Sequence, residues 1–386
     1  MYLTELALTN FRSYNELNLT FEPGVIALTG PNGVGKTNLL EAINFASTLI
    51  SHRVSTKAPL IAVGSDSAIV QARIKAGGRS SVIELELKEQ GSGKARINRG
   101  QVVSAAQVRG ILRAILFAPE DLSLVKGDPE GRRRFLDELI MQAKPVMAGT
   151  YRDFERVLRH RNALLRTARQ QGSHDVAMLE IITEQLVKLS AQIMTARIHI
   201  VQSLNKPLEA RYQQIASQVA PVALRLVAGQ DSEHLIPDIE LLEQSYALQF
   251  GELNTQELAR GQTLVGPQRD DVFLGIGDLP AKGYASHGES WSLALALKLS
   301  AFDYLSTLDL NSSFNIAADD VTTLALQQPV LLLDDVFAEL DTQRRENLSA
   351  TIKDIGQVFV TSAIASDIPS TLGARIITVS KGQAKG

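Results

Sequence analysis

Residues Gly30-Pro31-Asn32-Gly33-Val34-Gly35-Lys36-Thr37 match the pattern G-x-x-x-x-G-K-[ST] at every fixed position. The glycines let the backbone turn its N–H groups toward phosphate oxygens, Lys36 can neutralise the β- and γ-phosphates, and the Thr37 hydroxyl can bind Mg²⁺. An apolar run, Val25–Thr29, precedes the stretch, and a segment with helical spacing, Asn38–Phe45, follows it. This strand–loop–helix context favours an ATP site of residues 30–38 over an incidental glycine-rich turn.

The whole chain sets limits on the class of protein. Its 386 residues suffice for two domains or for one domain with a large insertion. It has no cysteine, which excludes disulfides, cysteine-ligated zinc and thiol catalysis. No apolar run approaches the ~18 residues that cross a bilayer, and the first residues do not resemble a signal peptide. We therefore expect a soluble, cytoplasmic protein with no membrane partner.

Alternating apolar and polar residues before and after the glycine-rich stretch predict antiparallel strands. Leu3–Leu8 and Leu17–Phe21 show this pattern, as do Ala68–Ile74 and Ser81–Leu87 on either side of a Gly-Gly pair. These strands predict a small antiparallel layer beside a parallel sheet. Arg12 lies between the first two strands, where it either reaches a phosphate of the nucleotide or is simply solvated.

Two stretches are candidates for a contact with DNA. The net charge of −3 argues against a uniformly basic surface, so a nucleic-acid site must be a local patch. Three consecutive arginines begin at Arg132, at the start of a predicted helix, where at most two of them face one partner. Arg132 and Arg133 either bind phosphates or form a solvated, salt-bridged turn.

The second candidate is a long amphipathic helix over residues 151–170. Its polar face carries six arginines, namely Arg152, Arg156, Arg159, Arg161, Arg166 and Arg169. A glycine-containing turn at 171–174 separates it from a second helix that runs to about Val219, and the two predict an antiparallel helical arm. A solubilising face is the alternative, but we favour DNA phosphate contact through Arg152, Arg156 and Arg159.

The apolar run Val330–Leu333 ends in two carboxylates, Asp334 and Asp335. This pattern is typical of a buried central strand of a parallel sheet, and ligands bind at the carboxyl ends of such strands. Paired with the glycine-rich loop, Asp334 can hold Mg²⁺ and Asp335 can orient or deprotonate the attacking water. Nearly three hundred residues separate the two motifs, so the ATPase head is assembled from both ends of the chain.

A third short motif, Ser286-His287-Gly288-Glu289-Ser290, precedes a predicted helix over Trp291–Leu305. By itself it is an ordinary helix N-cap, although the free N–H groups at a helix start also suit an anion.

Taken together, these motifs resemble the RecF family of bacterial recombination and repair ATPases, which are related to the heads of SMC proteins. The resemblance covers nearly the whole chain. It rests on the stretches Leu8–Tyr14, Gly30–Ala42, Pro119–Leu122, Lys126–Pro129, Arg132–Asp137, Gly266–Asp271 and Leu333–Asp341. It implies an α/β P-loop head of the ABC type, with a mixed sheet, an antiparallel β layer and an inserted helical arm.

The resemblance also implies how the motifs work. Ser286 and Gly288 fall where ABC-type heads contact the γ-phosphate held by the opposite subunit, so ATP would join two copies of the chain. The implied partners are double-stranded DNA at gaps and junctions, RecR, and indirectly RecO and RecA. Two features depart from transporter heads: His287 and Glu289 replace a glycine and a glutamine, and Thr361-Ser362 stands where transporters have a switch histidine.

The second carboxylate is Asp335 rather than the glutamate usual in ABC heads. A shorter carboxylate holds the water less closely, so we expect slow, weak ATP hydrolysis. We also expect DNA to stimulate this activity. The expected domains are an N-terminal head part, 1–125, an inserted arm, 126–262, and a C-terminal head part, 263–386. The alternatives are an SMC-like architectural DNA linker, disfavoured by the short arm, and a transporter ATPase subunit, disfavoured by the missing switch histidine.

Overall fold

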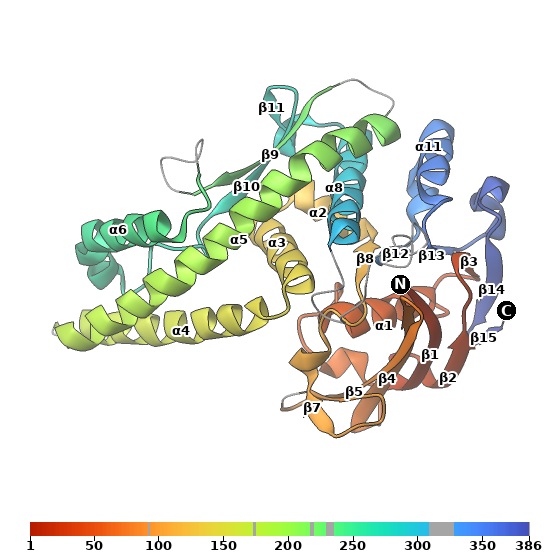
Figure 1. Ribbon diagram of the computed structural model, residues 1–386, viewed down its shortest axis with the longest axis horizontal. Helices are drawn as coiled ribbons and strands as arrows, with labels where there is room; N and C mark the ends of the chain where they lie inside the picture. The colour runs from red at the N-terminus through yellow and green to blue at the C-terminus, as the bar shows by residue number, and fades with distance from the viewer. Residues whose placement is uncertain (92, 173–174, 217–219, 229–234, 309–327, 386) are drawn as a thin grey trace. The chain divides into compact units, whose positions relative to one another are not determined.

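The computed structural model describes residues 1–91, 93–172, 175–216, 220–228, 235–308 and 328–385 (Figure 1). By its internal contacts the chain divides into two compact units. Unit 1 comprises residues 1–126, 206–221 and 283–386, and unit 2 comprises residues 127–205 and 222–282.

Unit 1 contains an antiparallel sheet whose strands follow the order β2-β1-β4-β5-β6-β7. The strands are β2 (Tyr14–Thr20), β1 (Tyr2–Phe11), β4 (Ser67–Ala76), β5 (Arg79–Lys88), β6 (Lys94–Ile97) and β7 (Val102–Ser104). Along β4 every second residue is buried up to Ile74, which is the pattern expected when one sheet face packs on a core. The predicted hairpin and antiparallel layer are confirmed.

The second sheet of unit 1 has the order β15-β14-β3-β13-β12-β8. Its strands are β15 (Gln383–Lys385), β14 (Arg375–Ser380), β3 (Gly24–Thr29), β13 (Gln357–Ser362), β12 (Val330–Leu333) and β8 (Ala114–Phe117). All neighbouring strands are parallel except β14 and β15. Because β13 pairs with both β3 and β12, the glycine-rich loop after β3 and the two acids after β12 emerge at the same sheet edge.

Helix α1 (Lys36–Thr48) packs against strands of both sheets. Its Leu39, Leu40 and Ile43 belong to one apolar cluster with residues of β1, β4, β3 and β12, and these leucines have the helical spacing of the sequence pattern. Further α-helices described in unit 1 are α2 (Ser123–Lys126), α8 (His287–Thr307) and α11 (Thr342–Ile352), and α7 (Ala281–Tyr284) spans the boundary between the units. Short 3₁₀ helices cover Ala58–Leu60, Ala105–Val108, Pro119–Leu122, Val336–Glu339, Ala365–Asp367 and Ser370–Leu372.

Unit 2 contains the long helices and a small antiparallel sheet of order β11-β10-β9. Its elements are α3 (Pro129–Ala143), α4 (Met147–Gln171), α5 (Val176–Ala216), β9 (Val222–Val227), α6 (Ile239–Arg260), β10 (Asp271–Ile276) and β11 (Leu279–Pro280). Helix α4 is capped after Gln171 by Gly172, which has a positive φ of 69°, and α5 then runs back beside it (Figure 1). The two predicted long helices are confirmed, although the expected end near Val219 lies outside the described residues.

The later domain boundary differs from the one expected at residue 262. Residues 263–282 belong to unit 2 because β10 pairs along its length with β9. Residues 206–221, which include the last turns of α5, belong to unit 1. Sheet pairing between distant segments sets these limits, and the sequence pattern around residue 262 carries no sign of it. In the described part of the chain, none of the helices has the length and apolar character that a bilayer span needs.

Candidate active site

The loop between β3 and α1 has a backbone that requires glycine. Gly30, Gly33 and Gly35 have φ values of 151°, 81° and 113°, a region that residues with a side chain rarely adopt. Space is limiting as well, because a Cβ on Gly35 would lie 2.8 Å from the Tyr14 hydroxyl and one on Gly30 would collide with the Val379 carbonyl. The loop therefore keeps its backbone close to neighbouring strands and turns into the start of α1, where free N–H groups favour an anion.

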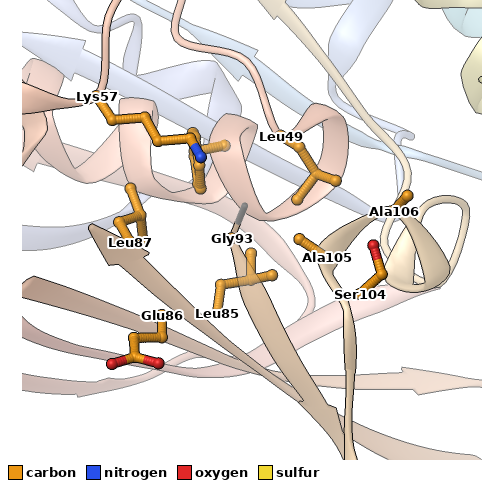
Figure 2. A pocket seen from close by; sticks show the side chains of 10 residues that line it. Leu49, Lys57, Leu85, Glu86, Leu87, Gly93, Ser104, Ala105 and Ala106 are labelled. Carbon is orange, nitrogen blue, oxygen red and sulfur yellow. The ribbon is translucent and has the colours of Figure 1, made fainter. Parts of the chain in front are cut away.

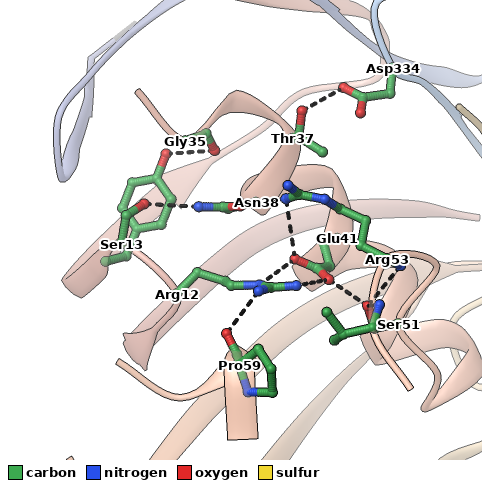
Figure 3. Close-up of polar contacts among 12 residues, drawn as sticks. Arg12, Ser13, Gly35, Thr37, Asn38, Glu41, Ser51, Arg53, Pro59 and Asp334 are labelled. Atoms are coloured by element: carbon green, nitrogen blue, oxygen red, sulfur yellow. Dashed lines mark hydrogen bonds and ion pairs between the residues drawn. The ribbon is translucent and has the colours of Figure 1, made fainter. Parts of the chain in front are cut away.

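Lys36 and Thr37 are the first two residues of α1. The Lys36 side chain folds over the loop, and its Nζ donates to the carbonyl oxygens of Gly30 at 2.7 Å and Pro31 at 3.0 Å. Thr37 Oγ1 donates to Asp334 Oδ1 at 3.1 Å, across 297 positions of the sequence. The structure thus brings the glycine-rich loop and the first carboxylate together (Figure 3).

Thr361, at the end of β13, contacts both carboxylate residues. Its Oγ1 donates to Asp334 Oδ1 at 2.6 Å and accepts from the Asp335 backbone N–H at 2.8 Å. Asp335 has a positive φ of 49°, an unusual conformation for a residue that is not glycine. The Thr361 hydroxyl thus helps to hold the turn that presents both acids.

Burial raises the pKa of Asp334 to about 6, and the nearby charge of Asp335 adds to that shift, whereas hydrogen bonds from Thr361 and Thr37 oppose it. A buried carboxylate of this kind gains from a cation. The oxygen donors of Thr37 and Asp334 are the ligands that Mg²⁺ prefers. No cluster of three or more His, Asp or Glu side chains that could hold a metal ion occurs in the described ranges.

Arg12 lies beside α1, bound to a buried glutamate that the sequence did not single out. Its Nε and Nη2 donate to the two carboxylate oxygens of Glu41 at 2.7 and 2.6 Å, and its Nη1 donates to the Pro59 carbonyl (Figure 3). Burial opposes ionisation of Glu41, but the hydrogen bonds from Arg12 and Ser51 outweigh it and lower its pKa. Arg12 is therefore fixed in place near the start of α1.

A second arginine reaches the same end of α1. Arg53 Nη1 donates to Asn38 Oδ1 at 3.1 Å, and Asn38 Nδ2 donates to Ser13 Oγ at 3.0 Å (Figure 3). Its side chain is 38% exposed, so Arg53 adds accessible positive charge next to Asn38. Sequence reasoning missed Arg53, Glu41 and the role of Thr361, because only their contacts in space connect them to the motifs.

A cavity of about 220 Å³ lies at the other end of α1 (Figure 2). Phe45 and Leu49 line it together with β5 residues and Lys57. None of the residues predicted for the nucleotide site lines this cavity. It is therefore separate from the phosphate-binding loop.

Ser286 caps the N-terminus of α8 through a capping box. Its Oγ accepts from the Glu289 N–H at 3.2 Å, and Glu289 Oε2 accepts from the Ser286 N–H at 2.8 Å. Ser286 and His287 are exposed, and Gly288 is partly exposed. The hydrogen bonds of Ser286 lie within the first turn of its own helix rather than with residues 30–37.

Comparison with known proteins places this arrangement in a family. The family model described as the RecF/RecN/SMC N terminal domain matches residues 2–384. The chain belongs to this family.

Curated members of the RecF family cover the chain almost completely. "DNA replication and repair protein RecF" of Streptomyces avermitilis is 45% identical over 99% of each chain, and the protein of the same description from Frankia alni is also 45% identical over 99% of each. A solved structure described as the recombination mediator protein RecF-ATP in the RecFOR pathway has a TM-score of 0.86 and 26% identity, covering 100% of this chain and 97% of that one. The SMC head domain of Pyrococcus furiosus, with a TM-score of 0.53 and 16% identity, shares the fold. The predicted fold class, an ABC-type ATPase head, is confirmed.

The structure separates the arginines proposed for DNA into two groups. Arg132 of this RecF family member is only 6% exposed, forms a two-fold hydrogen-bonded ion pair with Asp271, and donates to the Gly127 carbonyl. Its prediction as a phosphate contact is corrected, because a buried and paired guanidinium has no free face for DNA. Arg133 donates to the Asp270 carbonyl and is partly exposed.

Helix α4 carries the second group. Arg152, Arg156 and Arg159 are exposed, and Arg156 makes a surface ion pair with Asp153 at 3.2 Å. Arg161 is a further correction to the predicted basic face, since it is 1% exposed and paired with Glu257. Arg161 lies on the side of α4 that packs against other parts of unit 2. The exposed face of α4 therefore retains the three arginines singled out from the sequence.

Proposed function

We propose that this member of the RecF family is an ATP-dependent DNA-binding ATPase of recombinational repair and replication. The observation that carries the proposal is the hydrogen-bonded set Thr37–Asp334–Thr361, which joins the glycine-rich loop to the two acids. Those are the parts that bind and hydrolyse a nucleoside triphosphate in P-loop enzymes. The similarity to a RecF structure described with ATP supports the same ligand.

Each residue has a defined task in the proposed reaction. The backbone of Gly30–Gly35 and the Lys36 ammonium bind the phosphates, with Asn38 and Arg12 beside them. Thr37 and Asp334 would hold Mg²⁺, which when bound supplies positive charge that polarises phosphate oxygens. Asp335 orients the attacking water and accepts its proton. Its carboxylate is one methylene shorter than that of a glutamate, so we expect slow hydrolysis that DNA stimulates.

A second copy of the chain completes the site in this proposal. Ser286 and Gly288 lie at the exposed start of α8, where free N–H groups and the helix dipole favour an anion. By the family resemblance, they take the γ-phosphate of the ATP bound by the other copy. ATP binding would then close two heads, and hydrolysis would let them separate.

DNA is the proposed macromolecular partner. Arg152, Arg156 and Arg159 are exposed on α4 at spacings of four and three residues, which places them on one side of the helix. The curated relatives are named for DNA replication and repair. Binding to duplex DNA near gaps and junctions, and action with RecR, RecO and RecA, follow from the family resemblance and belong to the proposal.

The test is the molecular mass of the protein with ADP, with ATP, and with ATP plus duplex DNA, measured by light scattering. The expected result is a monomer with ADP and a dimer with ATP. Lys36→Arg, Asp334→Asn and Ser286→Arg should each reduce the dimer. A wild-type protein that stays monomeric with ATP, or three variants that all dimerise normally, would contradict the proposal.

A further inference from the structure

Gly288 packs directly against an arginine of another helix. A Cβ at this position would lie 2.7 Å from Nη1, 3.0 Å from Nη2 and 3.1 Å from Cζ of Arg344 in α11. All three atoms belong to the planar guanidinium, so the group lies against the glycine where any other residue would place its side chain. The absence of a side chain at 288 is what lets Arg344 approach the start of α8.

The same guanidinium binds Asp341, the residue that precedes α11. Arg344 Nη1 donates to Asp341 Oδ2 at 2.7 Å, and the Arg344 backbone N–H donates to Asp341 Oδ1 at 2.9 Å. The next residue, Arg345, donates from Nε to the Leu340 carbonyl at 2.8 Å. Asp341 is thus both the N-cap of α11 and the ion-pair partner of Arg344.

Two carboxylates, those of Asp341 and Glu289, lie near the positively charged side chain of Arg344. Asp341 is bound to it directly. Glu289 lies in the first turn of α8, where the hydrogen bonds from Ser286 lower its pKa and the charge of Arg344 contributes in the same direction. The side chain of Arg344 is only 22% exposed, and its Nε is buried without a hydrogen-bond partner in the described part of the chain. Tyr212 is fully buried; burial and the charge of Glu289 raise its pKa, and the charge of Arg344 lowers it.

From this arrangement we infer that Arg344 is a positioning residue of the surface that receives the partner's triphosphate. It contacts Gly288 at the start of α8 and Asp341 at the start of α11. It also compensates the carboxylates of Asp341 and Glu289, which would otherwise repel the incoming phosphates. The inference rests on the proposed ATP-dependent dimer and adds to it a residue that the sequence motifs do not mark. Without Arg344, the start of α8 keeps its N–H groups but faces two uncompensated negative charges.

The test uses Arg344→Met, which removes the charge and keeps much of the apolar stem, and Lys353→Gln, which removes an exposed charge from the C-terminal end of α11. Light scattering with Mg-ATP should show a dimer dissociation constant that is at least about tenfold higher for Arg344→Met and unchanged for Lys353→Gln. Binding of a fluorescent ATP analogue by the monomer should not change, because the hydrogen bonds of Arg344 are made to Asp341 and the phosphate-binding loop is a separate segment. Circular dichroism melting checks that the variants are folded.

Charge compensation by Arg344 predicts two further results that a purely structural role does not predict. Raising the salt concentration should restore part of the Arg344→Met dimer, because salt screens repulsion. Adding Asp341→Asn or Glu289→Gln to Arg344→Met should also strengthen the dimer, since asparagine still caps a helix and glutamine still completes a capping box.

The outcomes separate the inference from the proposed function. Failure of the wild-type protein to dimerise with ATP would overturn both. A wild-type dimer together with an Arg344→Met dimer of equal strength would overturn the inference alone. The inference alone also fails if Arg344→Met weakens the dimer and neither salt nor the second substitution restores any of it. If Arg344→Met does not fold, Arg344→Lys, which keeps the charge, is compared with Arg344→Gln. Dimerisation of the lysine variant that is no stronger than that of the glutamine variant would then overturn the inference.

Discussion

Thr361 shows how one hydroxyl can organise two acids. It is fully buried at the end of β13, donates to Asp334 and accepts from the Asp335 backbone N–H. Valine has nearly the same shape but offers neither a donor nor an acceptor. In its place the partly buried Asp335 N–H would lose its acceptor and Asp334 would lose a hydrogen bond.

We therefore expect Thr361→Val to lose about 1–3 kcal/mol of unfolding free energy. We also expect it to hydrolyse ATP more slowly, because the turn that presents Asp335 loosens. Urea unfolding and a phosphate-release assay measure the two effects. Thr361→Ser retains the hydroxyl and should keep most of the activity; if serine is as damaging as valine, packing of the methyl group and not the hydrogen bonds explains the loss.

In unit 2, two buried arginines from different helices donate hydrogen bonds to the segment Thr263–Asp271. Arg161 of α4 is 1% exposed and donates to Glu257 Oε2 at 2.6 Å, Thr263 Oγ1 at 3.0 Å and Thr183 Oγ1 at 2.9 Å. Arg197 of α5 donates to Asp137 and to the Pro267 carbonyl. The motif Gly266–Asp271, counted as part of the family resemblance, thus has a structural role within unit 2.

Arg161→Met should destabilise the protein by about 3–5 kcal/mol, because it leaves the fully buried Glu257 carboxylate without its ion-pair partner. The added substitution Glu257→Gln removes that charge and keeps an acceptor for the Leu264 N–H. The double variant should therefore recover much of the loss in a urea titration. Equal destabilisation of the single and double variants would show that the unpaired charge is not the cause.

If the protein binds DNA as proposed, the charge of the whole molecule requires a local basic surface. With a net charge of −3, the chain has no general attraction for phosphates, and we propose that the exposed arginines of α4 supply it locally. Replacing Arg152, Arg156 and Arg159 together by glutamine should weaken duplex binding. It should also reduce the slope of log affinity against log salt by about 0.9 for each DNA phosphate that the variant no longer neutralises.

Binding is measured by fluorescence anisotropy between about 50 and 200 mM salt. The matched control replaces three exposed lysines of the antiparallel sheet, Lys75, Lys88 and Lys94, by glutamine, which makes the same change in net charge. Unchanged affinity and slope in the arginine variant would contradict the assignment and direct attention to Arg133 and Arg134.

The elements around the phosphate-binding loop could be predicted because their signals are local. The apolar run before Gly30, the spacing of Leu39, Leu40 and Ile43, and the run before Asp334 each follow from side-chain periodicity within a few residues. Strand alternation likewise predicted the antiparallel layer. The limit of unit 2 could not be predicted, because β9 and β10 are separated in the sequence by α6.

The sequence by itself determined the glycine-rich loop, the two acids and the long helices of the arm, since the glycine conformations and the apolar patterns that define them need no distant partner. Only the tertiary structure decided which charged residues are exposed and could contact a partner. Arg132 and Arg161 look like Arg152 in the sequence, yet they are buried against Asp271 and Glu257. Thr361 and Arg344 acquire their roles from Asp334, Asp335, Gly288 and Asp341. The physical reason is that a charge or hydroxyl has no fixed role until folding places a partner beside it, and those partners come from distant segments or other helices.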